Sequence, residues 1–230
     1  MKRTFVLVLL ATGACARGPI PVADAELAGI TGKGLEPVDA ARKEEVSTRQ
    51  AIEARRLELS AAQREIRIAD AAARRDEADL EVARLRVEQA QETKDAEAML
   101  PANDRRAKAE KAMGVSQAEI PYRQAARAYA EARLREAEAT HDVALAQLER
   151  AKVVALMGGN PLPSQVERRA GFDGLVAKAQ ERLADATAKV ARAKGDLQIA
   201  ELARSGALNG AAAKPPAPVT SAPQAATAKP

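Results

Sequence analysis

Large apolar residues recur every seven positions in three stretches of the chain, with alanines placed between them. In the third stretch Val176, Leu183, Val190 and Leu197 are seven apart, and an alanine follows three residues after each. A repeat averaging 3.5 residues keeps one narrow stripe facing a partner helix and favours a left-handed supercoil. Small residues in such a stripe allow two helix backbones to approach closely. The pattern therefore predicts long, closely packed coiled-coil helices.

The three stretches predict three helices separated by two breaks. Residues 37–100 form the first, because no Gly or Pro interrupts them after Pro37. Pro101, Asn103 and Gly114 then indicate a turn region over 101–117, and a second helix is expected over 118–157. The third is expected from about 173 to 204, after GGNPLP at 158–163 and before a stop at Ser205-Gly206. The large seam positions are Ile52, Leu59, Ile66, Leu80 and Val87, then Leu134, His141 and Leu148, then Val176, Leu183, Val190 and Leu197.

Composition supports an all-α chain of elongated antiparallel coiled-coil helical hairpins. Aromatic residues are only 2% of the 230 residues and charged residues are 30%, which is typical of long helices and not of thick globular cores. The net charge is +4, but acids and bases are interspersed along the helices. A one-signed stripe or stacking aromatics, which nucleic-acid binding requires, is not present. We therefore expect no nucleic-acid partner.

The first residues, MKRTFVLVLLATGACAR, have the pattern of a secretory signal: a basic start, a short apolar run and small residues. Cys15 is the only cysteine, and its position after Thr12-Gly13-Ala14 resembles a bacterial lipoprotein box. In that interpretation Cys15 carries lipid, and the lack of Asp after it implies the outer membrane. The alternative is cleavage at Ala14-Cys15-Ala16, which removes the cysteine. No disulfide is possible in either case.

Outside the helices the chain divides into short segments of distinct composition. Residues 1–16 form the signal and lipobox region. The Gly- and Pro-containing residues 17–36 predict a flexible tether, with or without a short docked turn, that lets the helices stand off from a membrane. Residues 37–204 form the expected helical domain. Residues 205–230 are rich in Ala and Pro and predict a disordered tail, placed to contact peptidoglycan or another partner.

Candidate chemistry is sparse. His141 is the only histidine and lies in the predicted seam, where a polar residue fixes helix register. One histidine provides neither a metal cluster nor a catalytic dyad, and the carboxylates lie among Lys and Arg at helical spacing. We therefore expect no enzyme activity, no metal and no cofactor.

Residues 129–163, YAEARLREAEATHDVALAQLERAKVVALMGGNPLP, resemble a helical stretch of TolC-type outer-membrane efflux proteins. In those proteins an Ala/Leu-rich helix often ends in Leu-x-x-Leu-x-Gly before a proline-bearing turn, and here residues 154–161 read VALMGGNP. The resemblance implies a shared coiled-coil architecture in the same compartment. The α-hairpins of periplasmic adaptor proteins are comparably similar. Aromatic-rich strands for a barrel are lacking and the chain is about half the expected length, so no channel is expected.

Together these features predict a non-enzymatic envelope lipoprotein that acts as a periplasmic coiled-coil tether or scaffold. Its expected contacts are a membrane, through the N-terminal lipid, and protein partners or a second copy of the chain, through the coiled-coil faces. The alternative prediction is an accessory component of a TolC-like efflux or secretion complex.

Overall fold

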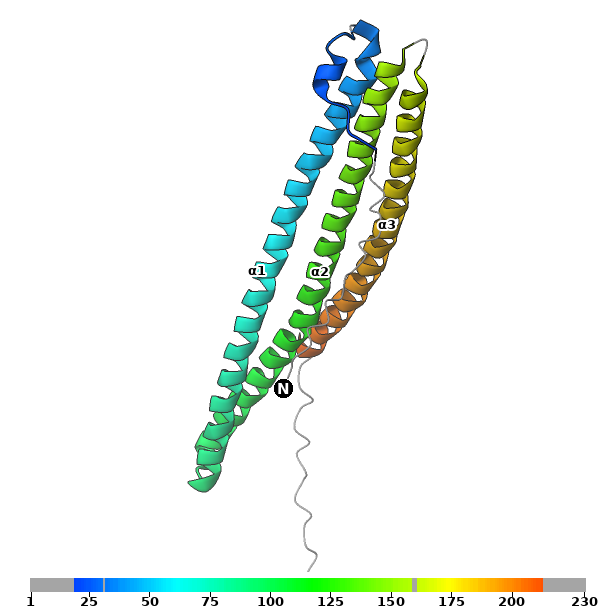
Figure 1. The fold of residues 1–230 in the computed structure, drawn as a ribbon. Helices are drawn as coiled ribbons and strands as arrows, with labels where there is room; N and C mark the ends of the chain where they lie inside the picture. The colour runs from blue at the N-terminus through cyan, green and yellow to red at the C-terminus, as the bar shows by residue number, and fades with distance from the viewer. Residues whose placement is uncertain (1–18, 31, 159–160, 213–230) are drawn as a thin grey trace, which may run out of the picture. The chain divides into compact units, whose positions relative to one another are not determined.

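The computed structural model describes residues 19–30, 32–158 and 161–212, and within these residues it contains helices and no strand (Figure 1). Two short 3-10 helices, η1 (Asp24–Leu27) and η2 (Gly32–Gly34), precede three long α-helices. These are α1 (Glu36–Glu92), α2 (Ala96–Met157) and α3 (Pro163–Ala212). The long helices pack against one another, so the predicted all-α class of antiparallel helical hairpins is confirmed.

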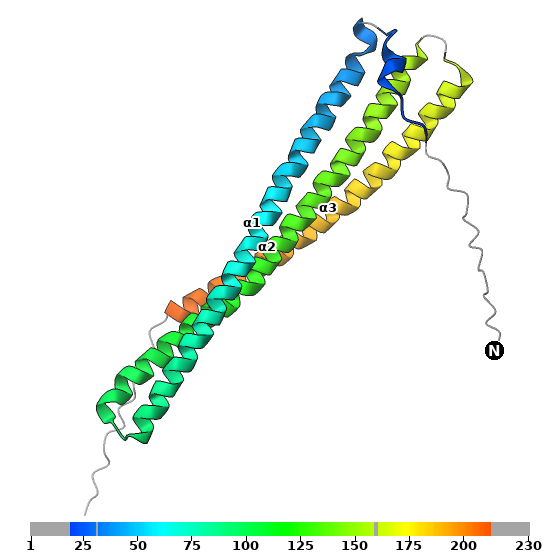
Figure 2. The same ribbon diagram turned by 60° about the vertical axis from the view of Figure 1, so that its left-hand side comes forward.

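The helices contribute to two compact units. Unit 1 contains the described residues up to Ala61 together with Ala128–Ala193, and unit 2 contains Ala62–Arg127 with the described residues from Lys194 on. Within unit 1 the α2 and α3 segments run antiparallel, because Glu136 contacts Thr187 whereas Arg150, further along α2, contacts the earlier residue Asp173. Figure 2 shows the same alternation of direction from a second side.

The turn between α1 and α2 lies at residues 93–95, not at 101–117 as predicted. Lys94 has a left-handed backbone with φ of 53°, and the Asp95 amide donates to the Ala90 carbonyl at 3.1 Å, which closes the end of α1. The Asp95 carboxylate then accepts hydrogen bonds from the amides of Glu97 and Ala98, both at 3.0 Å, and so begins α2.

The other predicted boundaries are partly corrected. Residues 101–117 belong to α2, which contains Pro101 and Pro121 within its length. The break after Met157 is confirmed, but α3 begins at Pro163 instead of 173. It also continues through Ser205-Gly206 to Ala212, so the first residues of the predicted tail are helical, and residues 213–230 lie outside the described residues.

The twelve predicted large seam residues are buried to different degrees. Ile52, Leu80, Val87 and Leu148 are buried, and the other eight are half-buried. Seven seam alanines are also buried: Ala69, Ala83, Ala90, Ala130, Ala144, Ala179 and Ala186. Each buried alanine contributes only about one methylene of transfer free energy, roughly 0.8 kcal/mol, so its main effect is close helix contact.

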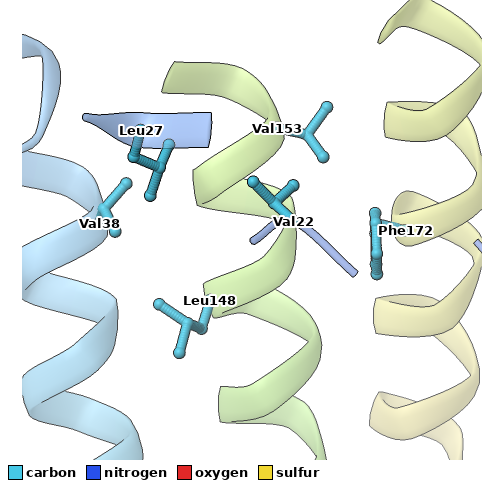
Figure 3. Close-up of a cluster of buried hydrophobic side chains, with 6 residues drawn as sticks. All are labelled: Val22, Leu27, Val38, Leu148, Val153 and Phe172. Atoms are coloured by element: carbon cyan, nitrogen blue, oxygen red, sulfur yellow. The ribbon is translucent and has the colours of Figure 1, made fainter. Parts of the chain in front are cut away.

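The core cluster of unit 1 includes residues from the predicted tether. Val22 and Leu27 are only 3% and 4% exposed, and they pack with side chains from all three helices (Figure 3). Those side chains are Val38 of α1, Leu148 and Val153 of α2, and Phe172 of α3. Residues 19–30 therefore pack against the helices, which is more docking than the single short turn that a flexible tether allows, because two apolar side chains in this segment fill the end of unit 1.

Candidate functional site

The main polar site of unit 1 is where the N-terminal segment meets α2. Lys152 is buried, and its ammonium group contacts the Val22 carbonyl at 3.4 Å, Asp24 at 3.2 Å and Glu149 at 2.9 Å. The Glu149 carboxylate in turn accepts a hydrogen bond from the Val22 amide at 2.8 Å. Arg42 of α1 also pairs with Asp24, at 3.1 Å. One lysine and one glutamate thus satisfy the backbone of the segment at the point where Val22 enters the core.

A second set of contacts attaches the segment to α3. The Arg168 guanidinium donates to the carbonyls of Ile20 and Pro21, at 2.8 and 2.5 Å, and to Glu26 at 3.2 Å. Gly171, one turn further along α3, lies beside the Pro19 ring, and a Cβ there would come within 3.1 Å of the proline Cβ. The absence of a side chain at 171 is therefore what allows the segment to lie this close to α3.

These contacts shift three pKa values in directions that favour docking. The hydrogen bond from Lys152 lowers the pKa of Asp24, and hydrogen bonds from the Ala23 amide and from Arg168 lower the pKa of Glu26. Burial acts to lower the pKa of Lys152, but its hydrogen bonds to Glu149 and Asp24 outweigh burial, and the pKa is raised. The charged forms of all three groups are therefore stabilised in the docked state.

His141 forms a separate polar cluster with α1 in unit 1. The Thr48 hydroxyl donates to the Glu45 carbonyl at 2.9 Å, and its oxygen lies 3.0 Å from Nδ1 of His141. Nε2 lies 3.9 Å from the Glu45 carboxylate, which also pairs with Arg49. This geometry is that of a polar seam position whose partners lie on the facing helix.

Unit 2 contains an aromatic and ionic cluster on α2 and α3. The Arg204 guanidinium carbon lies 4.6 Å from the centre of the Tyr122 ring, and that of Arg123 lies 5.4 Å from it. Arg204 also forms an ion pair with Glu119, without hydrogen-bond geometry at its buried Nε. Arg123 pairs with Glu119 and, at 3.4 Å, with Glu65 of α1. The cluster links the three helices within unit 2 through charge and cation–π contacts.

A shallow groove of about 320 Å³ separates α2 from α3 in unit 1. Phe172, Leu145 and Leu175 contribute its apolar surface. Acidic Asp142 and Glu149 line its α2 side, and basic Lys178 and Arg182 line its α3 side. An apolar floor between rows of opposite charge is suited to contact with a polypeptide.

Sequence reasoning missed Lys152 and Arg168, which hold the N-terminal segment. The sequence did carry a signal that the segment packs, namely Val22 and Leu27, two large apolar residues inside a stretch that Gly and Pro otherwise mark as irregular, but this signal does not identify the partners of the segment. The predicted lipidation site, Cys15, lies outside the described residues. No group of three or more His, Cys, Asp or Glu residues arranged to hold a metal occurs among the residues that the structure describes.

Comparison with protein-family models, with curated proteins and with solved structures finds no match for this chain. The similarity of residues 129–163 to TolC-type helices therefore stays a prediction. Within the described ranges, none of the helices combines the length and apolar character needed to cross a membrane.

Proposed function

We propose that this chain is a non-enzymatic coiled-coil scaffold of the bacterial envelope, anchored in the outer membrane by lipid on Cys15 and extending its helices into the periplasm to bind protein partners. The observation that carries the proposal is the docking of residues 19–30 onto the helices a few residues after Cys15. Because the segment that follows the anchor is docked, the anchor holds the whole of unit 1 close to the membrane.

Docking changes how the anchor would work. Pro19 is four positions after Cys15, and a fully extended chain covers about 3.5 Å per residue, so the lipid-bearing residue and the docked segment lie within about 14 Å of each other. The flexible tether expected from the sequence would have let the helices stand well away from the bilayer. With Pro19 held against Gly171, unit 1 is instead held next to the bilayer surface. The several acyl chains of a bacterial lipoprotein make such attachment effectively permanent.

The polar groups of unit 1 support a structural role over a catalytic one. Lys152, Glu149 and Asp24 satisfy one another and the Val22 backbone, and His141 is engaged by Thr48. Polar side chains that pair with one another inside a helix interface fix the register of the helices and the docking of the N-terminal segment. Glu149 also lines the groove between α2 and α3, but its carboxylate is already engaged by Lys152 and the Val22 amide.

The test is the variant Cys15→Ser, with Ala16→Ser as the matched control that keeps the cysteine. Wild type and control should incorporate labelled palmitate and stay with membranes at high salt, whereas Cys15→Ser should do neither. A wild-type protein whose mature N-terminus is an unmodified Arg17 would overturn the anchor. Purification with neighbouring proteins then identifies the partners: scaffold or wall-associated proteins support the proposal, and subunits of a transport complex would assign the chain to the accessory role instead.

A further inference from the structure

The α1 segment of unit 2 carries a second heptad row on its exposed side. The buried row of this segment includes Leu80, Ala83, Val87 and Ala90. Displaced from it by two residues is a row with the same alternating spacing of three and four, and all its members are exposed: Ile68, Ala71, Arg75, Ala78, Val82, Leu85 and Gln89. Two residues correspond to about 200° around a helix, so the second row lies opposite the first. We call it the outer row.

The outer row has the composition of a coiled-coil seam. Ile68, Val82 and Leu85 are 61%, 49% and 55% exposed, and Ala71 and Ala78 lie between them. Scattered apolar residues on a surface need no explanation, but a row that keeps heptad spacing from residue 68 to residue 89 is a helix-docking pattern. The α1 segment thus has two apolar faces, and within unit 2 only one of them is covered.

Charges beside the outer row identify what covers it. Arg67, Arg74, Glu81 and Glu88 follow one another at seven-residue intervals along one flank, all exposed. None of the four forms an ion pair within the described residues. The flank therefore changes sign at its middle, from two bases to two acids. A flank of this kind is complementary to itself when a second copy runs in the opposite direction, because Arg74 then faces Glu81 of that copy and Arg67 faces Glu88.

The residues of the outer row favour the same antiparallel arrangement. Consider an antiparallel pair whose two-fold axis passes between residues 76 and 77. Each layer of the interface then contains one residue from each copy: Ile68 with Leu85, Ala71 with Val82, and Arg75 with Ala78. Two of these layers combine a large with a small residue, and the third is filled by two large apolar residues. A parallel pair would place Arg75 against Arg75 and alanine against alanine. Like charges in one seam layer repel, and alanine pairs leave space unfilled.

We infer that the exposed outer row of α1 is the interface through which two copies of this chain associate, antiparallel and about a two-fold axis. A two-fold interface requires a self-complementary surface, which the reversal of charge between residues 74 and 81 provides. The outer row belongs to unit 2, whereas the docked N-terminal segment belongs to unit 1, so the interface can be measured on the protein without its lipid.

Sedimentation equilibrium of the full chain carrying Cys15→Ser tests this interface. The parent protein should be a concentration-dependent dimer. Leu85→Lys should weaken the dimer at least a hundredfold, because the two-fold axis introduces the change twice. The matched control Leu100→Lys alters a leucine of α2 that is 75% exposed but off the row, and it should leave dimerisation unchanged. Circular dichroism should show the same helicity in all three proteins. A monomeric parent at every concentration, or equal loss in both variants, would overturn the interface.

Charge exchange tests the direction. Arg74→Glu alone and Glu81→Arg alone should each weaken the dimer about tenfold, because each places like charges opposite one another twice. The double variant should restore it, since the two exchanged side chains again face each other with opposite charge. In a parallel pair position 74 lies against Asp79 of the other copy and position 81 against Arg86, so the same double variant makes both contacts repulsive. A double variant weaker than either single variant would therefore exclude the antiparallel pair.

Discussion

Truncation of Leu27 should open the N-terminal segment without unfolding the helices. Leu27 is 4% exposed and packs in the core cluster of unit 1, yet it belongs to a short segment outside the long helices. A buried Leu→Ala change costs about 2 to 5 kcal/mol, and we expect about 2 to 3 kcal/mol here because the site lies at the end of the helices. The cost falls on docking, since the heptad seams keep their contacts.

Hydrogen exchange measures this docking directly. The Val22 amide donates to the Glu149 carboxylate of α2 at 2.8 Å, and the amides of Glu26 and Ile30 donate within the segment to Ala23 and Leu27, both at 2.9 Å, so all three should be protected from exchange while the segment is docked. A loss of about 2 to 3 kcal/mol should accelerate their exchange about 30-fold to 150-fold, because each 1.4 kcal/mol changes the opening constant tenfold. Amides in the middle of α1 and α2 should exchange at their wild-type rates.

The matched control is Ile20→Ala. Ile20 is a residue of the same segment that is 75% exposed, so this change should leave exchange within about twofold of wild type. Two results would refute the reasoning. One is equal acceleration in both variants, which would mean that burial of Leu27 does not hold the segment. The other is acceleration spread evenly over all helices, which would mean that the segment and the helices open together.

Three further predictions concern the turn, acid and the seam. Lys94→Gly should raise the free energy of unfolding by roughly 0.5 to 1 kcal/mol in urea titration, because φ of 53° is strained for lysine; a destabilised variant would argue against this backbone. The pKa values of Asp24 and Glu26 are lowered by docking, so their charges stabilise the docked state at pH values above the ordinary carboxyl range, and this contribution is lost as the pH falls below about 4; Val22 methyl NMR signals that stay constant during acidification would contradict it. Leu183→Asp should lower stability by roughly 2 kcal/mol or more while the exposed Lys189→Asp is nearly silent in thermal melts, and equal losses would place the seam on another face.

The heptad spacing was sufficient to predict the fold class and the buried faces. Leu80 and Val87 are buried and Leu183 and Val190 half-buried where a 3.5-residue repeat places them, because helix packing depends on periodicity more than on the identity of any neighbour. The break at 158–163 was also predictable, since Gly158 has a positive φ of 49° and Pro161 follows it closely.

The first turn was not predictable by the same signals. The residue with the left-handed backbone in this turn is Lys94, although glycine is the usual sequence signal for that conformation. The prolines at 101 and 121, which usually signal the end of a helix, lie inside α2. A proline in a helix loses one hydrogen bond, and the packing of a long helix outweighs that local cost.

The polar contacts of the N-terminal segment depend on residues remote in the sequence. Neither Lys152 nor Arg168 stands out among the 36 Lys and Arg residues. Their roles arise only when the fold brings the segment against α2 and α3, so no local pattern could have revealed them.

The N-terminal segment and its partners lie far apart in the sequence, and this separation limits the order in which the parts of the protein can fold during synthesis. Its hydrogen bonds to Glu149, Lys152 and Arg168 span 127, 130 and 148 residues. A ribosome adds about 5 to 20 residues per second, so the segment waits roughly 7 to 30 s after its own synthesis before Arg168 has been made. The part of the described chain that is synthesised first is therefore among the last to reach its final position. A product that terminates before Glu149 lacks the α2 and α3 side chains that hydrogen-bond to the segment.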